Sequence, residues 1–189
     1  MTKTLTKRTA LERQHMREGQ RLRRERERWS RCVDLPSGGK LDLRHPSPDV
    51  ITLEDVATRL AACPRFAGEG IPVAAHCVLV CQRLREQGHA PDVQLAGLLH
   101  DCAEFATGDL IRPVKLLVRN FRAIERGVEE AVLSALDLSH IDLHDPVVKE
   151  ADVWSLTVET GKHDGPPIRL ITTRHTARKA FLAEHARLT

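Results

Sequence analysis

The sequence predicts an all-α fold of about six or seven helices behind a basic N-terminal extension. From residue 52 onward, apolar residues recur three and four positions apart, which is the period of an α-helix. Proline and glycine fall mainly between these periodic stretches. Aromatic residues make up only 3% of the 189 residues, with no tyrosine, which argues against a β-sandwich or barrel.

The first helices follow from their end signals. Thr52 is a typical N-cap for a helix that runs to about Cys63 before Pro64. The next helix is expected between Pro72 and Gly88. A longer one is expected from Pro91 without interruption to about Phe105, followed by helices over 111–118 and 124–136. We therefore expect five successive helices in the middle of the chain.

Two more helices complete the prediction. Asp145 and Pro146 form an N-cap followed by a proline at the first helical position, and that helix is expected to reach about Thr160. The last helix is expected to follow Pro167 and to include four apolar residues: Leu170, Ile171, Ala177 and Phe181.

The chain is expected to have three parts: an extension (1–31), a connector (32–50) and a helical domain (51–189). The extension carries eleven Lys/Arg and four Glu, a net +7 within a chain of +3, so the remainder is −4. We interpret it as a solvated helix or disordered arm; contact with nucleic acid or an acidic partner is a second, less favoured interpretation. The connector alternates Leu41 and Leu43, which favours a short β-excursion.

The five cysteines and the length of the apolar runs indicate the cellular compartment that we expect for the protein. No CxxC pair occurs, so we interpret the cysteines as reduced, mostly buried thiols of a cytoplasmic protein. No apolar run approaches the ~18 residues of a membrane span, so no membrane contact is expected. The cysteines are Cys32, Cys63, Cys77, Cys81 and Cys102.

The stretch "LLHDCAEFATGD" (98–109) places His100, Asp101 and Glu104 within an apolar segment. On one continuous helix these side chains would share a single arc. Burying such groups is costly unless something pairs with them, and a divalent cation would do so.

Two further residues complete a candidate metal site. His76 lies among apolar residues in "PVAAHCVLV", and Asp152 lies at the edge of an apolar stripe in "VVKEADVWSL". Alone, His76 would be interpreted as a satisfied core histidine and Asp152 as a helix-surface charge. Together with His100 and Asp101 they provide two imidazoles and two carboxylates, a good ligand set for a divalent ion.

The order His, His-Asp, Asp on successive helices resembles the HD superfamily of metal-dependent phosphohydrolases, over about residues 49–160. The sequence is similar in particular to bacterial 5′-deoxynucleotidases and phage deoxynucleoside triphosphohydrolases. Four segments carry the resemblance: "CPRF" (63–66), "VAAHCVLV" (73–80), "AGLLHDCAEFATGDLIRPVK" (96–115) and "VVKEAD" (147–152).

The resemblance implies that His76, His100, Asp101 and Asp152 hold one divalent ion, which can be Mn, Co, Fe, Mg or Zn. Glu104 would orient or deprotonate the attacking water, or protonate the leaving oxygen. The resemblance also implies that Asp109 fixes a water or a neighbouring cation; alternatively it is a turn aspartate. Arg65 and Lys115 would bind phosphate, and Phe66 would contact the sugar or base.

The predicted activity is hydrolysis of a phosphate ester in a deoxynucleotide, by a homo-oligomeric enzyme like its relatives. Two alternatives remain. One is a di-iron oxygenase, which would need further histidines; His140 and His144 lie in the loop "LSHIDLHD" before Asp152. The other is a non-catalytic nucleotide-binding or nucleic-acid-associated protein that uses the basic extension.

Overall fold

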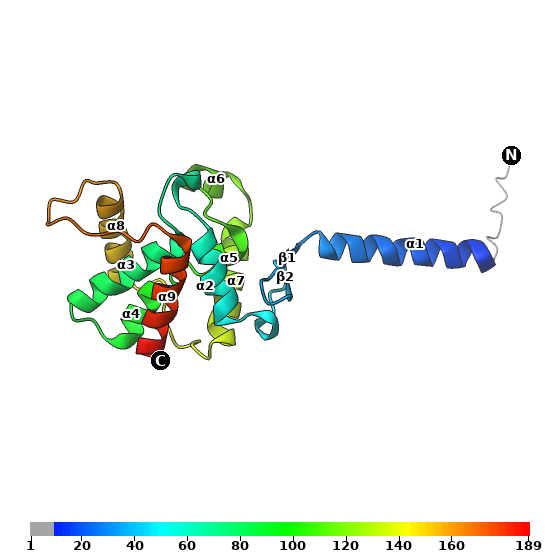
Figure 1. Ribbon diagram of the computed structural model, residues 1–189. Coiled ribbons are helices and arrows are strands. Elements are labelled where there is room, and N and C mark those ends of the chain that lie inside the picture. The colour runs from blue at the N-terminus through cyan, green and yellow to red at the C-terminus, as the bar shows by residue number, and fades with distance from the viewer. Residues whose placement is uncertain (1–9) are drawn as a thin grey trace. The chain divides into compact units, whose positions relative to one another are not determined.

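The structure is a computed structural model that describes residues 10–189 and divides into two units, Met1–Cys32 and Val33–Thr189 (Figure 1). In the first unit the described residues form helix α1 (Ala10–Trp29). The first nine residues of the predicted extension lie outside the described part. The side chains over 13–27 are exposed, as expected for a segment with few apolar residues.

A short two-stranded sheet follows α1 in the chain, formed by β1 (Cys32–Asp34) and β2 (Lys40–Asp42). This is the β-excursion that the alternating leucines predict. Leu41 on β2 is fully buried and belongs to the main hydrophobic core.

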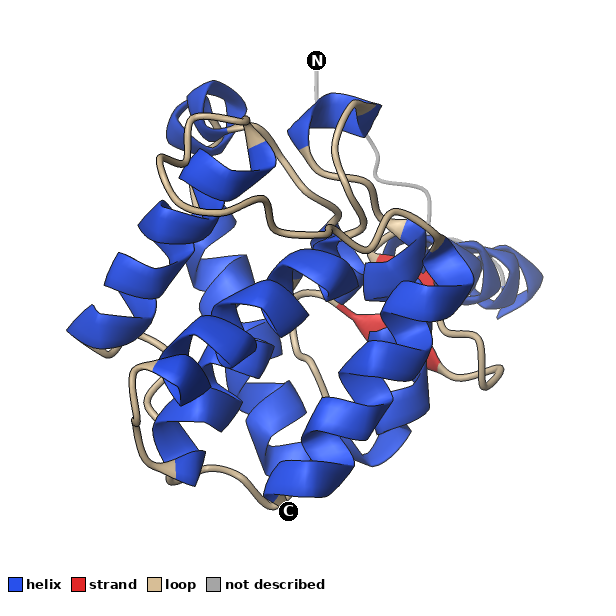
Figure 2. Cartoon of the chain, turned by 60° about the vertical axis from the view of Figure 1, so that its left-hand side comes forward, coloured by secondary structure: helices blue, strands red, loops and turns tan. Residues whose placement is uncertain are grey.

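The second unit is helical, which confirms the all-α class (Figure 2). None of the helices over residues 10–189 has the length and apolar character needed to cross a bilayer. All five cysteines are free thiols, and three of them are buried. Two 3₁₀ turns, Pro48–Val50 and Phe66–Gly68, accompany these helices: α2 (Leu53–Ala62), α3 (Val73–Glu86), α4 (Pro91–Leu99), α5 (Glu104–Thr107), α6 (Arg112–Leu117), α7 (Phe121–Ala135), α8 (Pro146–Glu159) and α9 (Arg174–Leu188).

Helix α3 is the centre of the core. Every residue from Val73 to Cys81 is buried, and α3 packs against α2, α4, α8 and α9 (Figure 1). Gly97 lets α4 approach closely, because a Cβ there would lie 2.4 Å from Cδ1 of Leu84 on α3. This close packing brings the end of α4 beside the middle of α3.

The predicted continuous helix from Pro91 to Phe105 is wrong. Helix α4 ends at Leu99, turns follow, and α5 begins at Glu104. His100 Nδ1 lies 2.8 Å from the Gly97 carbonyl oxygen, the acceptor that a continuing helix would offer to the amide of Asp101. The arc argument for one helix therefore fails, although its residues do meet in space.

The start of the last helix is also corrected. Helix α9 begins at Arg174, where the Thr173 side chain accepts a hydrogen bond from the amide of Thr176. This local cap is a stronger start signal than the apolar residues near Pro167. Ala177 and Phe181 are buried on α9, whereas two predicted members lie in the loop before it: Leu170 and Ile171.

Candidate metal centre

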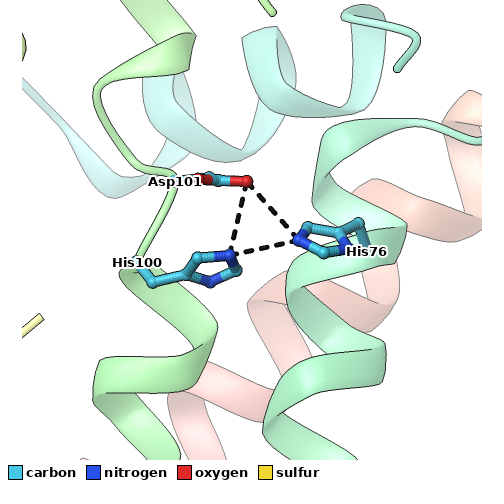
Figure 3. A group of neighbouring side chains, drawn as sticks. All are labelled: His76, His100 and Asp101. Carbon is cyan, nitrogen blue, oxygen red and sulfur yellow. Dashed lines mark hydrogen bonds and ion pairs between the residues drawn. The ribbon is translucent and has the colours of Figure 1, made fainter. Parts of the chain in front are cut away.

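Three ligand atoms converge where α3 meets the turn after α4 (Figure 3). Nε2 of His76 lies 3.1 Å from Nε2 of His100. Oδ2 of Asp101 lies 3.4 Å from Nε2 of His76 and 3.3 Å from Nε2 of His100. Ligand bonds of about 2.1 Å at right angles place neighbouring donor atoms about 3 Å apart, so this spacing fits one shared cation.

Asp152 on α8 lies next to this group. Its Oδ1 lies 3.3 Å from Nε2 of His76 and 4.0 Å from Nε2 of His100. Its other oxygen is paired with Lys149, one turn earlier on the same helix. Among the described residues, the three whose donor atoms all lie within 4.8 Å of one another are His76, His100 and Asp101, and the Asp152 carboxylate lies beside the two histidines.

Both histidines are oriented through their second ring nitrogen. Nδ1 of His76 lies 2.7 Å from Oε1 of Glu159 and 3.1 Å from the Ser155 hydroxyl, while Nδ1 of His100 faces the Gly97 carbonyl. A carboxylate or carbonyl partner holds the proton on Nδ1 and leaves the lone pair of Nε2 for a metal.

Sequence reasoning missed Ser155 and Glu159. They lie three and seven residues after Asp152, so all three side chains share one face of α8. That spacing was the signal that could have identified them, because polar residues on a helix face directed at a core histidine need a partner there.

Arg65 lies beside the ligands. Its Nε is 3.0 Å from Oε2 of Glu159, and its Nη1 is 3.3 Å from Oδ2 of Asp101. The Arg65 side chain is only 12% exposed. A largely buried guanidinium next to the donor atoms can bind an oxyanion that reaches the metal.

The loop that carries Arg65 has an unusual backbone. Phe66 and Ala67 have φ of 53° and 55°, a left-handed conformation that costs free energy outside glycine. The Phe66 amide donates a 2.9 Å hydrogen bond to Oδ2 of Asp109. In the part of the chain that the structure describes, no hydrogen bond or ion pair joins Asp109 to the four predicted ligands, so its contact is with this loop.

Glu104 and Lys115 form a pair of their own. Nζ of Lys115 lies 3.0 Å from Oε1 of Glu104 and 2.9 Å from Oε1 of Glu125. Glu104 is nearly buried, and burial together with the nearby Asp101 charge raises its pKa to about 8, against the opposing effect of Lys115. The structure therefore places Lys115 against the predicted acid or base.

The charges at the ligand cluster favour a cation. Burial alone would lower the pKa of His76, but hydrogen bonds to Asp101, Asp152 and Glu159 outweigh burial and raise it to about 10. Burial opposes ionisation of Asp101 and Asp152 as well, yet the adjacent histidines hold both carboxyl pKa values below their usual range. A positive charge is therefore stabilised among these four side chains.

A cavity of about 280 Å³ opens onto three of the ligands. This cavity exposes two carboxylates and one imidazole near the candidate metal position. Its lining comprises His100, Asp101, Glu125, Glu129, Leu143, His144, Val148, Lys149 and Asp152.

Comparison with known proteins adds one relative. No family model matches the chain. The chain is 37% identical over 97 residues to an uncharacterized protein of Rhodobacter capsulatus, a match that covers 48% of this chain and 48% of that protein. The aligned region thus spans about half the length of the relative, which brings no activity with it.

Proposed function

We propose that this chain is a metal-dependent phosphohydrolase of the HD superfamily that acts on deoxynucleotides, as a 5′-deoxynucleotidase or a deoxynucleoside triphosphohydrolase. One observation carries the proposal: donor atoms of His76, His100 and Asp101 lie within 4.8 Å of one another, with the Asp152 carboxylate 3.3 Å from Nε2 of His76. The Arg65 guanidinium adjoins this group at 3.3 Å from Asp101. A cation and a guanidinium side by side are suited to a phosphate group.

His76, His100, Asp101 and Asp152 would hold a single divalent ion. Two imidazoles and two carboxylates suit Mn²⁺, Co²⁺, Fe²⁺, Mg²⁺ or Zn²⁺. When bound, the ion supplies a Lewis acid and an acidified water for attack on phosphorus. Arg65 would bind the non-bridging phosphate oxygens, on which charge increases during the reaction.

Glu104 is the proposed proton carrier. In the reaction the oxygen of water forms a bond to phosphorus and gives up one proton, the bond from phosphorus to the leaving oxygen breaks, and that oxygen takes up one proton. A carboxyl group with a pKa of about 8 holds a proton at neutral pH and can donate it. Lys115, at 3.0 Å, would fix the orientation of that carboxyl group.

Phe66 and Asp109 have supporting roles in the proposal. Phe66 is 37% exposed and lies beside Arg65, and in the proposal it would contact the sugar or base of a bound nucleotide. Asp109 holds the amide of Phe66 and so keeps the left-handed loop in the conformation that presents Arg65. This is a different task from fixing a water or a neighbouring cation.

The test is release of phosphate and of triphosphate from a panel of dNMPs, dNTPs and NTPs with Mn²⁺ or Co²⁺. Phosphate from dNMPs alone indicates a 5′-deoxynucleotidase, and intact triphosphate from a dNTP indicates a triphosphohydrolase. If the metal is bound and no substrate of the panel is hydrolysed, the nucleotide assignment is overturned. Oxygen consumption by the iron-loaded protein would favour the di-iron oxygenase.

Two variants separate metal binding from catalysis. Glu104→Gln is expected to retain Mn²⁺ and lose turnover by about 10²- to 10⁴-fold, the usual contribution of a positioned acid or base. Asp101→Asn is expected to lose the metal and the activity together. Glu130→Gln, at an exposed position on α7, and Asp92→Asn, at the exposed start of α4, are the matched controls.

A further inference from the structure

Helix α1 carries an arginine face. At 100° per residue, Arg13, Arg17, Arg21 and Arg24 fall within an arc of about 80°. Their side chains are exposed, and the last three border one shallow groove together with Gln20 and, at one edge, Glu25. Four of the positive charges of the extension are therefore gathered on one side of the helix.

Within the described residues these arginines have no ion-pair partner. Among the described residues, the ion pair of α1 joins Arg23 to Glu27, which lie outside the arginine face. No ion pair in the described part of the chain involves Arg13, Arg17, Arg21 or Arg24. Guanidinium groups without an ion-pair partner are available to form charge-assisted hydrogen bonds with an anionic ligand. The arginine face is therefore suited to bind a ligand with several negative charges.

The row has a regular spacing. Its members follow one another at about 4.5 to 6 Å along the axis and cover about 16 Å in total, from the 1.5 Å rise per residue. A nucleic-acid strand presents a phosphate every 3.4 Å along the duplex axis, and a helix of 10–12 Å diameter fits the major groove. Over the roughly 16 Å that the arginines cover, one strand of a duplex presents about four or five phosphates, so one row can meet several of them.

We propose that the arginine face of α1 binds the phosphate backbone of nucleic acid, without reading its sequence. A lipid surface is the weaker match, because Met16 and Leu22 are the only large apolar side chains described over 13–27 and offer little to bury in a bilayer. The proposal depends on α1 alone and stands apart from the activity proposed for the helical unit.

The experiment measures fluorescence anisotropy of a labelled 20-base-pair duplex with the full chain, in EDTA, between 50 and 200 mM salt. The variant Arg17→Ala/Arg21→Ala removes two charges from the arginine face. Arg23→Ala/Arg26→Ala removes two charges from the other sides of the same helix. Alanine favours helix, so circular dichroism should show α1 retained in both.

Each phosphate contact contributes about −0.9 to the slope of log K against log salt. The Arg17/Arg21 variant is therefore expected to have a slope smaller in magnitude by about 1.8. The factor by which its affinity falls between 50 and 200 mM salt should then be about twelvefold smaller than for the unchanged chain. The Arg23/Arg26 variant should keep the slope of the unchanged chain.

Three outcomes would overturn the proposal. They are equal losses in the two double variants, no binding to duplex DNA at 50 mM salt, and stronger binding to phosphatidylserine vesicles or polyglutamate than to DNA. The first would mean that only net charge matters, and the last that the partner is a lipid surface or an acidic protein.

Discussion

Oε1 of Glu159 lies 2.7 Å from Nδ1 of His76, and both side chains are almost completely buried. The other oxygen of the same carboxylate lies 3.0 Å from Nε of Arg65. One buried carboxylate therefore orients a predicted metal ligand and the predicted phosphate-binding arginine. This arrangement makes Glu159 a positioning residue whose effect should be visible in metal binding as well as in turnover.

Glu159→Gln is expected to weaken Mn²⁺ binding by about 10- to 100-fold, the usual cost of losing a carboxylate behind a histidine ligand. The amide keeps the shape of the side chain but loses the charge that supports His76 and Arg65. Isothermal titration calorimetry measures the affinity, and Glu150→Gln, at an exposed position on the same helix, is the control. Unchanged Mn²⁺ affinity in Glu159→Gln would refute the positioning role.

Metal binding should release protons. With a pKa of about 10, His76 is protonated at pH 7.5 in the metal-free protein, and a ligand nitrogen must lose its proton to bind a metal. We expect release of about one proton per Mn²⁺ and an affinity that rises as pH increases toward 10. Calorimetry in buffers of different ionisation enthalpy measures this release.

His175→Gln, on the exposed side of α9, should release the same number of protons as the unchanged chain. A binding enthalpy that does not depend on the buffer would contradict the protonated state of His76.

Gly97→Ala is expected to lower the free energy of unfolding by about 1–3 kcal/mol, because its Cβ would meet Leu84 at 2.4 Å in a filled core. Gly127→Ala on α7 is the control, since its Cβ meets Pro46 at an ordinary 3.7 Å and should be neutral or stabilising. Urea denaturation measures both. If the two alanines have equal effects, the close packing of α3 and α4 does not depend on Gly97.

The start of α2 should give an acid-dependent contribution to stability. Asp55 accepts hydrogen bonds from Thr52 and the Ser37 amide, and although burial raises its pKa, these bonds outweigh burial and lower it. A lowered pKa stabilises the fold above the unfolded value of about 3.9, and this stabilisation is lost as pH falls through the folded pKa.

Asp55→Ala should therefore cost about 1–2 kcal/mol at pH 7 and less below pH 4. Urea denaturation at a series of pH values measures the difference, with Asp164→Ala in an exposed loop as the control. A cost that stays constant down to pH 2 would exclude the ionised carboxylate as its cause.

Much of the fold could be predicted from local signals. Thr52 and Asp145 act as N-caps where the sequence predicts them, because capping depends on neighbouring residues alone. The break after Leu99 could not be predicted in this way. It depends on the His100 ring taking the Gly97 carbonyl, and apolar periodicity contains no sign of that contact.

The candidate site could likewise be predicted in part. His76, His100, Asp101 and Asp152 could be identified because buried polar residues in apolar segments need a common explanation. The pairing of Lys115 with Glu104 could not be predicted, because that contact depends on how the chain turns after α5. The contact of Glu159 with His76 joins residues 83 positions apart and depends on how α3 packs against α8, so only the spacing of Glu159 from Asp152 could have indicated it.

His76 has no exposed surface and lies in the most buried helix of the unit. A histidine in that place cannot serve as a ligand without also being part of the core. In the absence of an ion the core must accommodate a protonated ring among carboxylates, so a ligand that binds only the folded chain shifts the folding equilibrium. Metal shortage in a cell would then lower the abundance of the protein, through proteolysis of unfolded chains, as well as its activity.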